Sequence, residues 1–194
     1  MILSNTEIHK ALNEGRLIIR PEPKPRFKGI KDKYCPYDAH TVDLRLGKEI
    51  TKPLKGSYAY DFSAPGNIAD LISKNSKKIT LSEDQPFHLK RSRFILAQTL
   101  EHVELPKEVG PPYLGARIEG KSSRSRCGLL VHFTAPTIHP GWAGQLTLEI
   151  INFGPIPIIL HPGMPIAQLL IEQVEGEIID NPSQFQNQKT PEGL

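Results

Sequence analysis

The spacing of hydrophobic and polar positions divides the chain into two parts. Near the start, Ile8 and Leu12 recur at helical spacing. Ser4 and Glu7 stand where a capping box begins a helix, and Gly15 stands where a glycine ends one. The first twenty residues therefore predict an amphipathic helix followed by a short strand.

From residue 86 onward, short apolar or alternating runs follow one another with proline and glycine between them. These runs include "RFILAQTLEHVELP", "YLGARIEG", "QLTLEIINFG" and "PIAQLLIEQVEG". Strands at roughly ten-residue spacing with turn signals between them favour a jelly roll or barrel-like β domain over a doubly wound sheet. Another strand, "TVDLRLG", and a short helix, in "GNIADLISK", are expected earlier in the chain. The predicted fold class is mainly β with a few short helices.

Composition indicates one ordinary globular domain. The chain has 194 residues, of which 38% are hydrophobic, and this is enough for one sizeable core. We expect a single domain over 1–194, with its β core at 86–175 and a C-terminal flap at 176–194. Residues 21–40 are rich in proline and lysine and are interpreted as a surface excursion rather than a linker.

The charge balance is mild, with a net charge of +3 and a pI of about 8.8. No long block of like charges indicates an arm for nucleic acid, and no apolar run approaches the roughly 20 residues that span a bilayer. We therefore expect a cytoplasmic protein that binds neither nucleic acid nor membrane. Cys35 and Cys127 are too few for a disulfide framework and are expected to be reduced thiols.

One stretch matches a nucleotide-binding pattern. Residues 115–122 of "GARIEGKSSRSR" satisfy G-x-x-x-x-G-K-[ST], in which a glycine-rich turn cradles phosphates. A P-loop needs a strand before it, a helix after it and a parallel sheet around it. Here Leu114, Ala116 and Ile118 alternate with charged residues, so the supposed loop is itself a plausible strand. We therefore disfavour a P-loop nucleotidase.

A dense polar cluster follows that strand. Backbone N–H groups, hydroxyls and several cations in succession suit a phosphate chain, although a solvated basic turn would have the same composition. The residues alone favour neither. The cluster consists of Lys121, Ser122, Ser123, Arg124, Ser125 and Arg126.

A carboxylate, Glu149, stands within the apolar run "QLTLEIINFG". It is either on a solvent-facing side of a strand or in a partly dry pocket, where a carboxylate can carry protons. The residues alone favour the solvent-facing side. The "HVE" at 102–104 matches the first half of the zinc deaminase signature, but no C-x-x-C completes it.

Taken together, the motifs resemble the dCTP deaminases, which are relatives of the trimeric dUTPases. The motifs that carry the resemblance occur in the family's order over nearly the whole chain: "HTVDLRLG", "GKSSRSRCGLLVHFTA", "IHPGWAGQLTLEI", "HPGMPIAQL" and "QFQNQ". The resemblance implies a dUTPase-like distorted β-barrel that assembles as a homotrimer with active sites shared between subunits. It also implies Mg²⁺ bound through the nucleotide triphosphate, no zinc, and conversion of dCTP to dUTP and ammonia in pyrimidine deoxynucleotide metabolism.

The resemblance also implies roles for residues that match by position. Glu149 would be the general base that activates water for attack at cytosine C4. Ser122 would hydrogen-bond near the reacting centre, and Arg126 would orient Glu149 or the base. The full set implied to bind nucleotide is Lys121, Ser122, Ser123, Arg124, Ser125, Arg126, His139, Thr147, Leu148, Gln184 and Gln188. The protein itself supplies no metal ligand.

The sequence departs from the family at several of these places. His139 replaces an Asp that contacts deoxyribose or, in relatives that hydrolyse dUTP, assists the attacking water. In the C-terminal flap, Gln184 replaces a phosphate-binding Lys and Phe185 replaces a Tyr, whereas Gln188 matches. Two alternatives therefore remain open: a dUTP-hydrolysing or bifunctional enzyme, and a non-catalytic homologue that binds deoxynucleotides.

Overall fold

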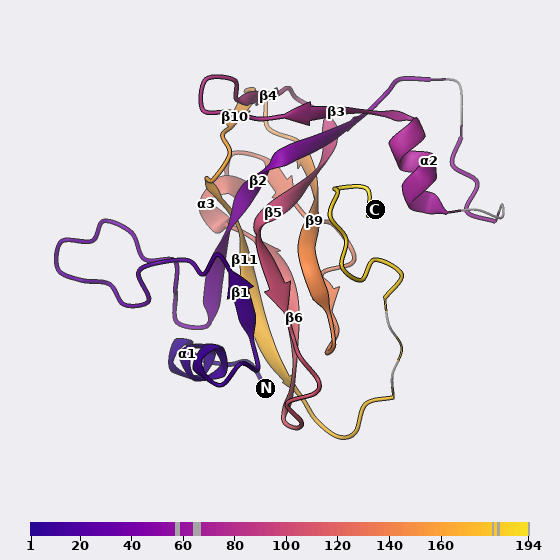
Figure 1. Ribbon diagram of the computed structural model, residues 1–194. Coiled ribbons are helices and arrows are strands. Elements are labelled where there is room, and N and C mark those ends of the chain that lie inside the picture. Colours follow the sequence, from indigo (N-terminus) through magenta and orange to yellow (C-terminus); the bar gives the residue numbers. More distant parts are fainter. Residues whose placement is uncertain (57–58, 64–66, 180, 182, 194) are drawn as a thin grey trace.

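The computed structural model describes residues 1–56, 59–63, 67–179, 181 and 183–193 (Figure 1). The flap prediction at 176–194 includes 180, 182 and 194, which lie outside the described residues. The helices and strands, in chain order, are α1 (Asn5–Asn13), β1 (Ile18–Arg20), β2 (Thr41–Pro53), α2 (Ile68–Lys74), β3 (Ser76–Thr80), β4 (Phe87–Leu89), β5 (Phe94–Glu104), β6 (Tyr113–Gly120), α3 (Ser122–Ser125), β7 (Leu129–Val131), β8 (Thr137–Ile138), β9 (Ala143–Asn152), β10 (Ile158–Leu160) and β11 (Pro165–Val174). Of the described helices, none is long and apolar enough to cross a membrane.

The helix predicted at the N-terminus is confirmed. The Ser4 side chain caps α1 by accepting a hydrogen bond from the backbone N–H of Glu7 at 3.4 Å. Gly15 then adopts a φ of +72°, which ends the helix. Ile8 and Ala11 are fully buried, so the apolar face of α1 packs on the sheet.

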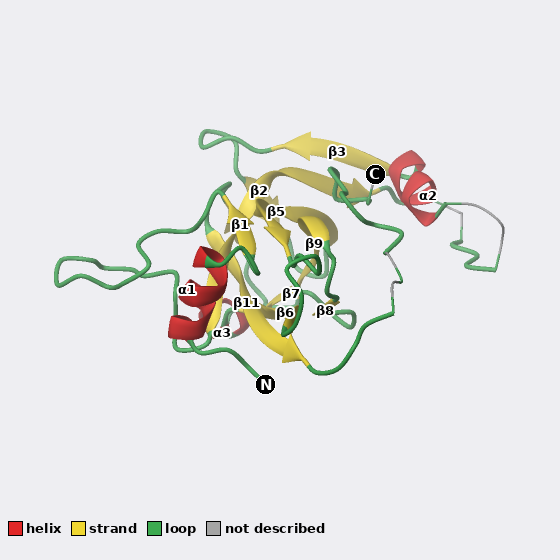
Figure 2. Cartoon of the chain, turned by 60° about the horizontal axis from the view of Figure 1, so that its bottom comes forward, coloured by secondary structure: helices red, strands yellow, loops and turns green. Residues whose placement is uncertain are grey.

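The strands form one strongly curled antiparallel sheet, and they confirm the prediction of a mainly β fold. Its order is β7-β9-β5-β2-β11-β6-β8, with β1 added to β5 and β3 added to β2, while β10 and β4 pair separately. Figure 2 shows that the sheet bends around an interior instead of lying flat. Side chains that alternate inward from facing strands fill this interior, among them Leu44, Ile95, Leu148 and Ile171, each fully buried.

The P-loop alternative is excluded by β6. This strand pairs antiparallel with β11 along its whole length, from Tyr113 opposite Val174 to Gly120 opposite Ala167. Its Leu114 is 2% exposed and belongs to the core. The glycine-rich match is therefore a strand, and the four-residue helix α3 follows it in an antiparallel rather than a parallel sheet.

A close contact between two glycines fixes the turn after α3. Gly128 has a φ of +86°, and a β-carbon added there would stand 2.2 Å from the backbone nitrogen of Gly154. A side chain at this position would force the two backbone segments apart. The pair therefore sets where the cluster at 121–126 lies relative to β7 and β9.

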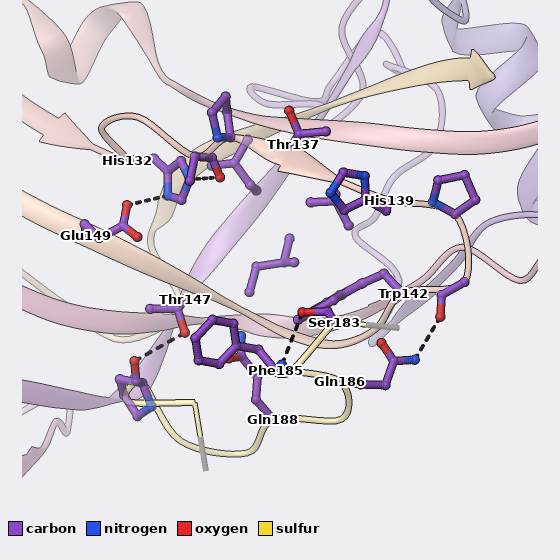
Figure 3. Close-up of a pocket in the computed structure, with 18 of the residues that line it drawn as sticks. His132, Thr137, His139, Trp142, Thr147, Glu149, Ser183, Phe185, Gln186 and Gln188 are labelled. Carbon is purple, nitrogen blue, oxygen red and sulfur yellow. Dashed lines mark hydrogen bonds and ion pairs between the residues drawn. The ribbon is translucent and has the colours of Figure 1, made fainter. Parts of the chain in front are cut away.

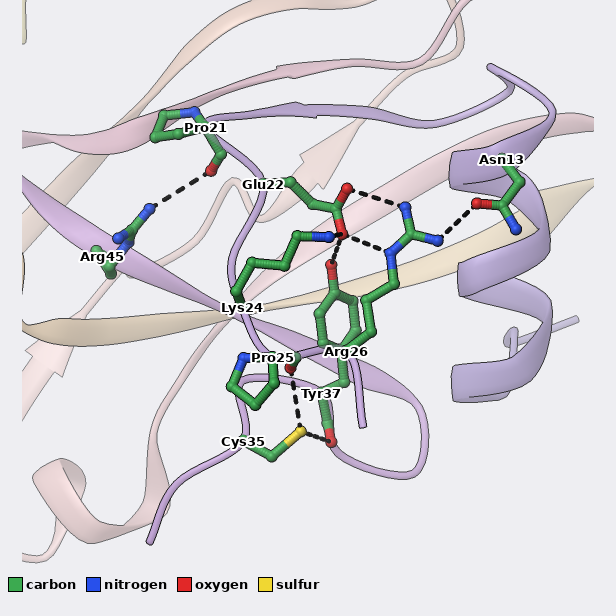
Figure 4. Close-up of polar contacts among 9 residues, drawn as sticks. All are labelled: Asn13, Pro21, Glu22, Lys24, Pro25, Arg26, Cys35, Tyr37 and Arg45. Carbon is green, nitrogen blue, oxygen red and sulfur yellow. Dashed lines mark hydrogen bonds and ion pairs between the residues drawn. The ribbon is translucent and has the colours of Figure 1, made fainter. Parts of the chain in front are cut away.

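The excursion at 21–40 is a folded lobe, tied together by the carboxylate of Glu22 (Figure 4). Glu22 accepts hydrogen bonds from Lys24 at 2.8 Å, from two nitrogens of Arg26 and from the Tyr37 hydroxyl at 3.3 Å. Arg26 also donates to Asn13 of α1 at 2.6 Å. The bonds from Arg26, above all, lower the pKa of Glu22 to about 2. The lobe is thus attached to the body of the molecule through charge-assisted bonds.

Candidate active site

A cavity of about 600 Å³ opens beside β9. Three segments supply most of its lining: the polar side of β9, the segment from residue 132 to residue 142 that follows β7, and the C-terminal tail, defined here as the described residues from 183 to 193. Figure 3 shows His132 and Glu149 side by side on one wall, with Phe185 and Gln188 of the tail on another. This volume is in the range of small-molecule sites.

Strand alternation puts Glu149 into the cavity. Leu148 and Ile150 are fully buried in the core, so Thr147 and Glu149 face the other way and line the cavity. The Glu149 side chain is 30% exposed. The solvent-facing position that the residues alone favoured is therefore wrong, because the segment after β7 and the tail cover this part of the strand.

Glu149 is in contact with His132, a residue to which sequence reasoning gave no role. His132 Nδ1 lies 2.9 Å from Glu149 Oε2, and His132 Nε2 lies 2.8 Å from the carbonyl oxygen of Ala135. A carbonyl oxygen only accepts, so Nε2 must carry a hydrogen. Nδ1 and Oε2 would then be two acceptors facing each other unless Nδ1 also carries a hydrogen. The 2.9 Å contact is therefore an ion pair when the imidazole is charged and faces the carboxylate.

The environment favours the charged imidazole. Burial lowers the pKa of His132, but the contacts with Glu149 and with the Ala135 carbonyl more than offset this, so the pKa lies above its usual value. His132 also has a φ of +140°, which side-chain-bearing residues rarely adopt. Strain of this kind persists where the surroundings fix it, often at functional sites.

No signal in the sequence identified this contact. His132 lies in "GLLVHFTA", within the motifs that carried the resemblance, but seven scattered histidines gave no reason to select it. The contact depends on the unusual backbone after β7, which turns the side chain back toward β9.

The tail runs along an edge of β9 that β7 leaves open. β7 pairs only with Ile150–Asn152, and the tail takes the edge before that point. The hydrogen bonds that hold it there include Gln186 Nε2 to Gly141 O at 2.8 Å, Asn187 N to Ala143 O at 2.8 Å, and Gln188 Nε2 to Gln145 O at 2.6 Å. The tail is thus an integral wall of the cavity.

The far end of the tail is anchored by a buried acid. Glu192 is 2% exposed, and its carboxylate accepts a hydrogen bond from Thr51 of β2 at 2.7 Å, with Lys78 of β3 at 3.6 Å. Burial raises the pKa of Glu192, but the bonds from Thr51 and the backbone outweigh it, so the pKa is lowered. An ionised Glu192 therefore closes the tail onto the sheet.

The residues implied by the resemblance divide between two places. Glu149, Thr147, His139 and Gln188 line this cavity. Leu148 is buried in the core, so only its backbone is near. The exposed Gln184 is not part of the lining.

The cluster at 121–126 is not part of this cavity. Its members Ser122, Ser123, Ser125 and Arg126 are exposed on and after α3. The remaining two line a different cavity, with Lys121 paired to Asp43 of β2. One chain alone therefore does not bring Ser122 and Arg126 to Glu149. Among the described residues, no three or more His, Cys, Asp or Glu side chains form a group that could hold a metal ion.

Comparison with known proteins gives the family. The model of the dCTP deaminase-like family matches residues 2–174. The chain belongs to this family. Among relatives, the dCTP deaminase of Rhodospirillum rubrum is 36% identical over 174 residues, which are 89% of this chain and 82% of that protein. The dUMP-forming dCTP deaminase of Methanosphaera stadtmanae is 40% identical over 177 residues, 88% of this chain and 78% of the relative.

A solved structure of a dCTP deaminase has the same fold as this chain. The 2'-deoxycytidine 5'-triphosphate deaminase from Agrobacterium tumefaciens matches 89% of this chain with a TM-score of 0.62 at 18% identity. This chain spans about half of that chain's length, 48%. The curled sheet with its short helices is therefore the dUTPase-like distorted barrel that the motifs predicted.

Proposed function

We propose that this protein hydrolyses dCTP to dUTP and ammonia, in the cytoplasmic metabolism of pyrimidine deoxynucleotides. The observation that carries the proposal is the ion pair formed by Glu149 and His132, a carboxylate and an imidazole 2.9 Å apart on the wall of a cavity of about 600 Å³. General acid–base chemistry needs such a group, able to take a proton and return it. Membership of the family supports dCTP as the substrate.

The proposed reaction uses Glu149 as the proton carrier. Its carboxylate takes a proton from water while the oxygen of that water forms a bond to C4 of cytosine, and Glu149 then passes this proton to the ring nitrogen N3. The carboxylate next takes the proton of the new C4 hydroxyl and gives it to the amino group. The C4–N bond breaks, ammonia leaves, and the carbonyl of uracil forms at C4. His132 holds the carboxylate in place through the ion pair.

The open edge of β9 suits recognition of the base. Ala143 and Gln145 direct their carbonyls toward this edge, where the tail bonds to them. Alternation along the strand turns the backbone groups of Thr147 in the same direction. We propose that a pyrimidine pairs with the backbone at Thr147 and Leu148 beside Glu149, with His139 near the sugar.

We further propose that the site is completed by a neighbouring subunit of a homotrimer. Ser122 and Arg126 are exposed on their own chain and outside the cavity that holds Glu149. Exposed apolar side chains also lie on and near β7, where Leu130 is 38% and Phe133 is 41% exposed. An assembly that covers these side chains would bring the serines and Arg126 of one subunit to the Glu149 of the next.

Magnesium enters this proposal only with the substrate. Its ligands in this proposal are oxygens of the triphosphate. The ion would reduce the charge that the cationic cluster has to neutralise. Ser123 and Lys121 are proposed to contact the phosphates together with the neighbouring backbone, and for Lys121 this requires its ammonium to exchange the Asp43 carboxylate for phosphate.

The test is to identify products. Purified protein is incubated with Mg²⁺ and dCTP or, separately, dUTP, and nucleotides are separated by chromatography while ammonia is measured. The expected result is dUTP and ammonia in equal amounts from dCTP. Tight binding of dCTP without any product would instead identify a non-catalytic homologue.

A second candidate function is release of dUMP, as in relatives named dUMP-forming at 34 to 40% identity. That reaction needs a group to activate water at phosphorus, and His139 stands where relatives of this kind carry a carboxylate. Glu108, from the connection between β5 and β6, lines the same cavity and is the carboxylate that we propose as a replacement. In the product assay, this candidate predicts dUMP and pyrophosphate, both lost in Glu108→Gln.

A further inference from the structure

A second cavity lies on another part of the molecule. Its volume is about 590 Å³, and it shares no lining residue with the Glu149 cavity. The lobe at 21–40, the start of β2 and the segment at 121–124 form its walls. The residues of α3 and its two caps therefore face two directions. Lys121 and Arg124 line this cavity within their own chain, whereas Ser122 and Arg126 are exposed and lie outside it.

Two carboxylates line this cavity, the exposed Asp38 and the buried Asp43, and Asp43 is already neutralised. Asp43 is 3% exposed, and its carboxylate accepts hydrogen bonds from the ammonium of Lys121 and from the hydroxyl of Tyr34. Burial, together with the bond to Asp43, raises the pKa of Tyr34, so the hydroxyl stays a donor. The guanidinium of Arg26 is likewise paired, with the carboxylate of Glu22.

Other cations on the walls have no partner. The Arg124 side chain makes no hydrogen bond or ion pair with any described residue, and its Nε is buried. Lys28 and Lys33 of the lobe also line the cavity without an ion pair in the described part of the chain. A buried guanidinium nitrogen without an acceptor is costly. The three cations outnumber the exposed carboxylate of Asp38, so the cavity keeps a positive excess that attracts an anion.

The cavity also has an aromatic wall. Phe27 lines it and is 70% exposed, and Tyr34 lines it and is 44% exposed. Exposed aromatic faces beside cations suit a ligand with a flat ring and a charged chain, since bases stack on such faces while Arg and Lys bind phosphate. An inorganic anion would use only the cations.

We propose that this second cavity binds a nucleoside phosphate, whose phosphates contact Arg124, Lys28 and Lys33 and whose base packs against Phe27. The site lies outside the cavity proposed for deamination and does not depend on that function. It would make the protein responsive to a nucleotide other than the one it converts.

The experiment uses ATP as the probe and separates the two cavities by fluorescence. Trp142 is the one tryptophan of the sequence and lines the Glu149 cavity. Binding of ATP is followed by calorimetry and, in parallel, by Trp142 emission. We expect about one ATP per chain with no change in emission, and an affinity at least tenfold weaker in Arg124→Ala and in the double variant Lys28→Ala, Lys33→Ala. The matched control is Lys31→Ala, a lysine of the same lobe that does not line the cavity, with less than a twofold effect.

Three outcomes overturn the proposal: no heat of binding, a change in Trp142 emission that follows the heat, or an affinity that Arg124→Ala leaves unchanged. Arg124→Gln provides a second variant if the alanine variant does not fold. Tripolyphosphate serves as the phosphate-only probe. If it binds as tightly as ATP and Phe27→Ala has no effect, the site is one for polyphosphate and the assignment of a nucleoside is wrong.

Discussion

At the scale of residues, the ion pair of His132 and Glu149 places a carboxylate in the cavity beside a charged imidazole. The Ala135 carbonyl requires a hydrogen on Nε2 of His132, so the pair with Glu149 requires a second hydrogen on Nδ1. The two side chains therefore act together, and replacing either changes the surroundings of the other.

Replacing Glu149 tests this pair directly. Glu149→Gln keeps the shape of the side chain but cannot take a proton from water, so we expect turnover of dCTP to fall by about 10²- to 10⁴-fold while dCTP binding and the melting temperature change little. Steady-state kinetics give the turnover of dCTP, and calorimetry gives its binding and the melting temperature. Near-normal turnover would remove Glu149 from the mechanism.

The raised pKa of His132 predicts how stability depends on pH. A raised folded pKa means that the charged imidazole stabilises the folded chain fully below the unfolded value of 6.5, and that this contribution is lost as pH rises through the folded value. The difference in melting temperature between the wild type and His132→Asn should therefore be largest near pH 5 to 6 and shrink at alkaline pH. The exposed His88 supplies the control, His88→Asn. A difference in melting temperature that does not change with pH would contradict the raised pKa of His132.

Of these two residues, the sequence revealed one. Strand alternation marks Glu149 as a polar exception in an apolar run, but its role as general base comes from the resemblance to the family. Its surroundings were misjudged because the covering segments come from elsewhere in the chain. His132 was missed because its contact depends on a backbone conformation that no residue preference predicts.

At the scale of elements, the tail replaces a missing strand partner of β9. The N-terminal helix, the strand at 113–120 and the alternation of β9 were all predicted, because caps and periodicity are local signals. The path of the tail was not. Its contacts pair glutamine side chains with distant carbonyls, and such pairings follow from tertiary structure alone.

The anchor of the tail predicts a kinetic effect. Glu192→Gln removes the charge that Thr51 and Lys78 stabilise, so the tail should detach more often and the KM for dCTP should rise several-fold with a smaller change in kcat. Because the pKa of Glu192 is lowered in the fold, its contribution is present above its usual value of 4.5 and lost as pH falls through the folded value. Limited proteolysis of the tail reports the detachment. The exposed Glu177 provides the control, and equal KM values for Glu192→Gln and Glu177→Gln would rule out the anchor.

The contact between Gly128 and Gly154 predicts a large effect on stability. Gly128→Ala adds a β-carbon 2.2 Å from the Gly154 nitrogen at a positive φ, so it should lower the free energy of unfolding by well over about 1 kcal/mol. Gly110 has a similar φ of +82° but no atom within 4 Å of an added β-carbon. Gly110→Ala therefore measures the cost of the backbone conformation alone, and denaturant unfolding of both variants isolates the steric part. Equal losses would mean that the contact can relax.

At the scale of the whole molecule, a shared site makes two inactive variants complement each other. Glu149→Gln and Arg126→Ala should each be inactive, but mixed trimers contain sites with Glu149 from one subunit and Arg126 from the next. When the two variants mix randomly in equal amounts, about a quarter of the sites combine an intact Glu149 with an intact Arg126. Activity after refolding the mixture, with sedimentation to confirm the trimer, gives the answer. No recovery in a mixed trimer would show that each chain builds its own site.

The strand β2 links features that were described separately. Its 13 residues span about 40 Å and hold Asp43 of the second cavity, Arg45, which binds the buried Glu101, and Thr51 of the tail anchor. Hydrogen bonds to β11, β5 and β3 make it one cooperative unit. In native-state hydrogen exchange, the amides at its two ends should open with the same free energy, and loosening one end by Asp43→Asn should speed exchange at the other.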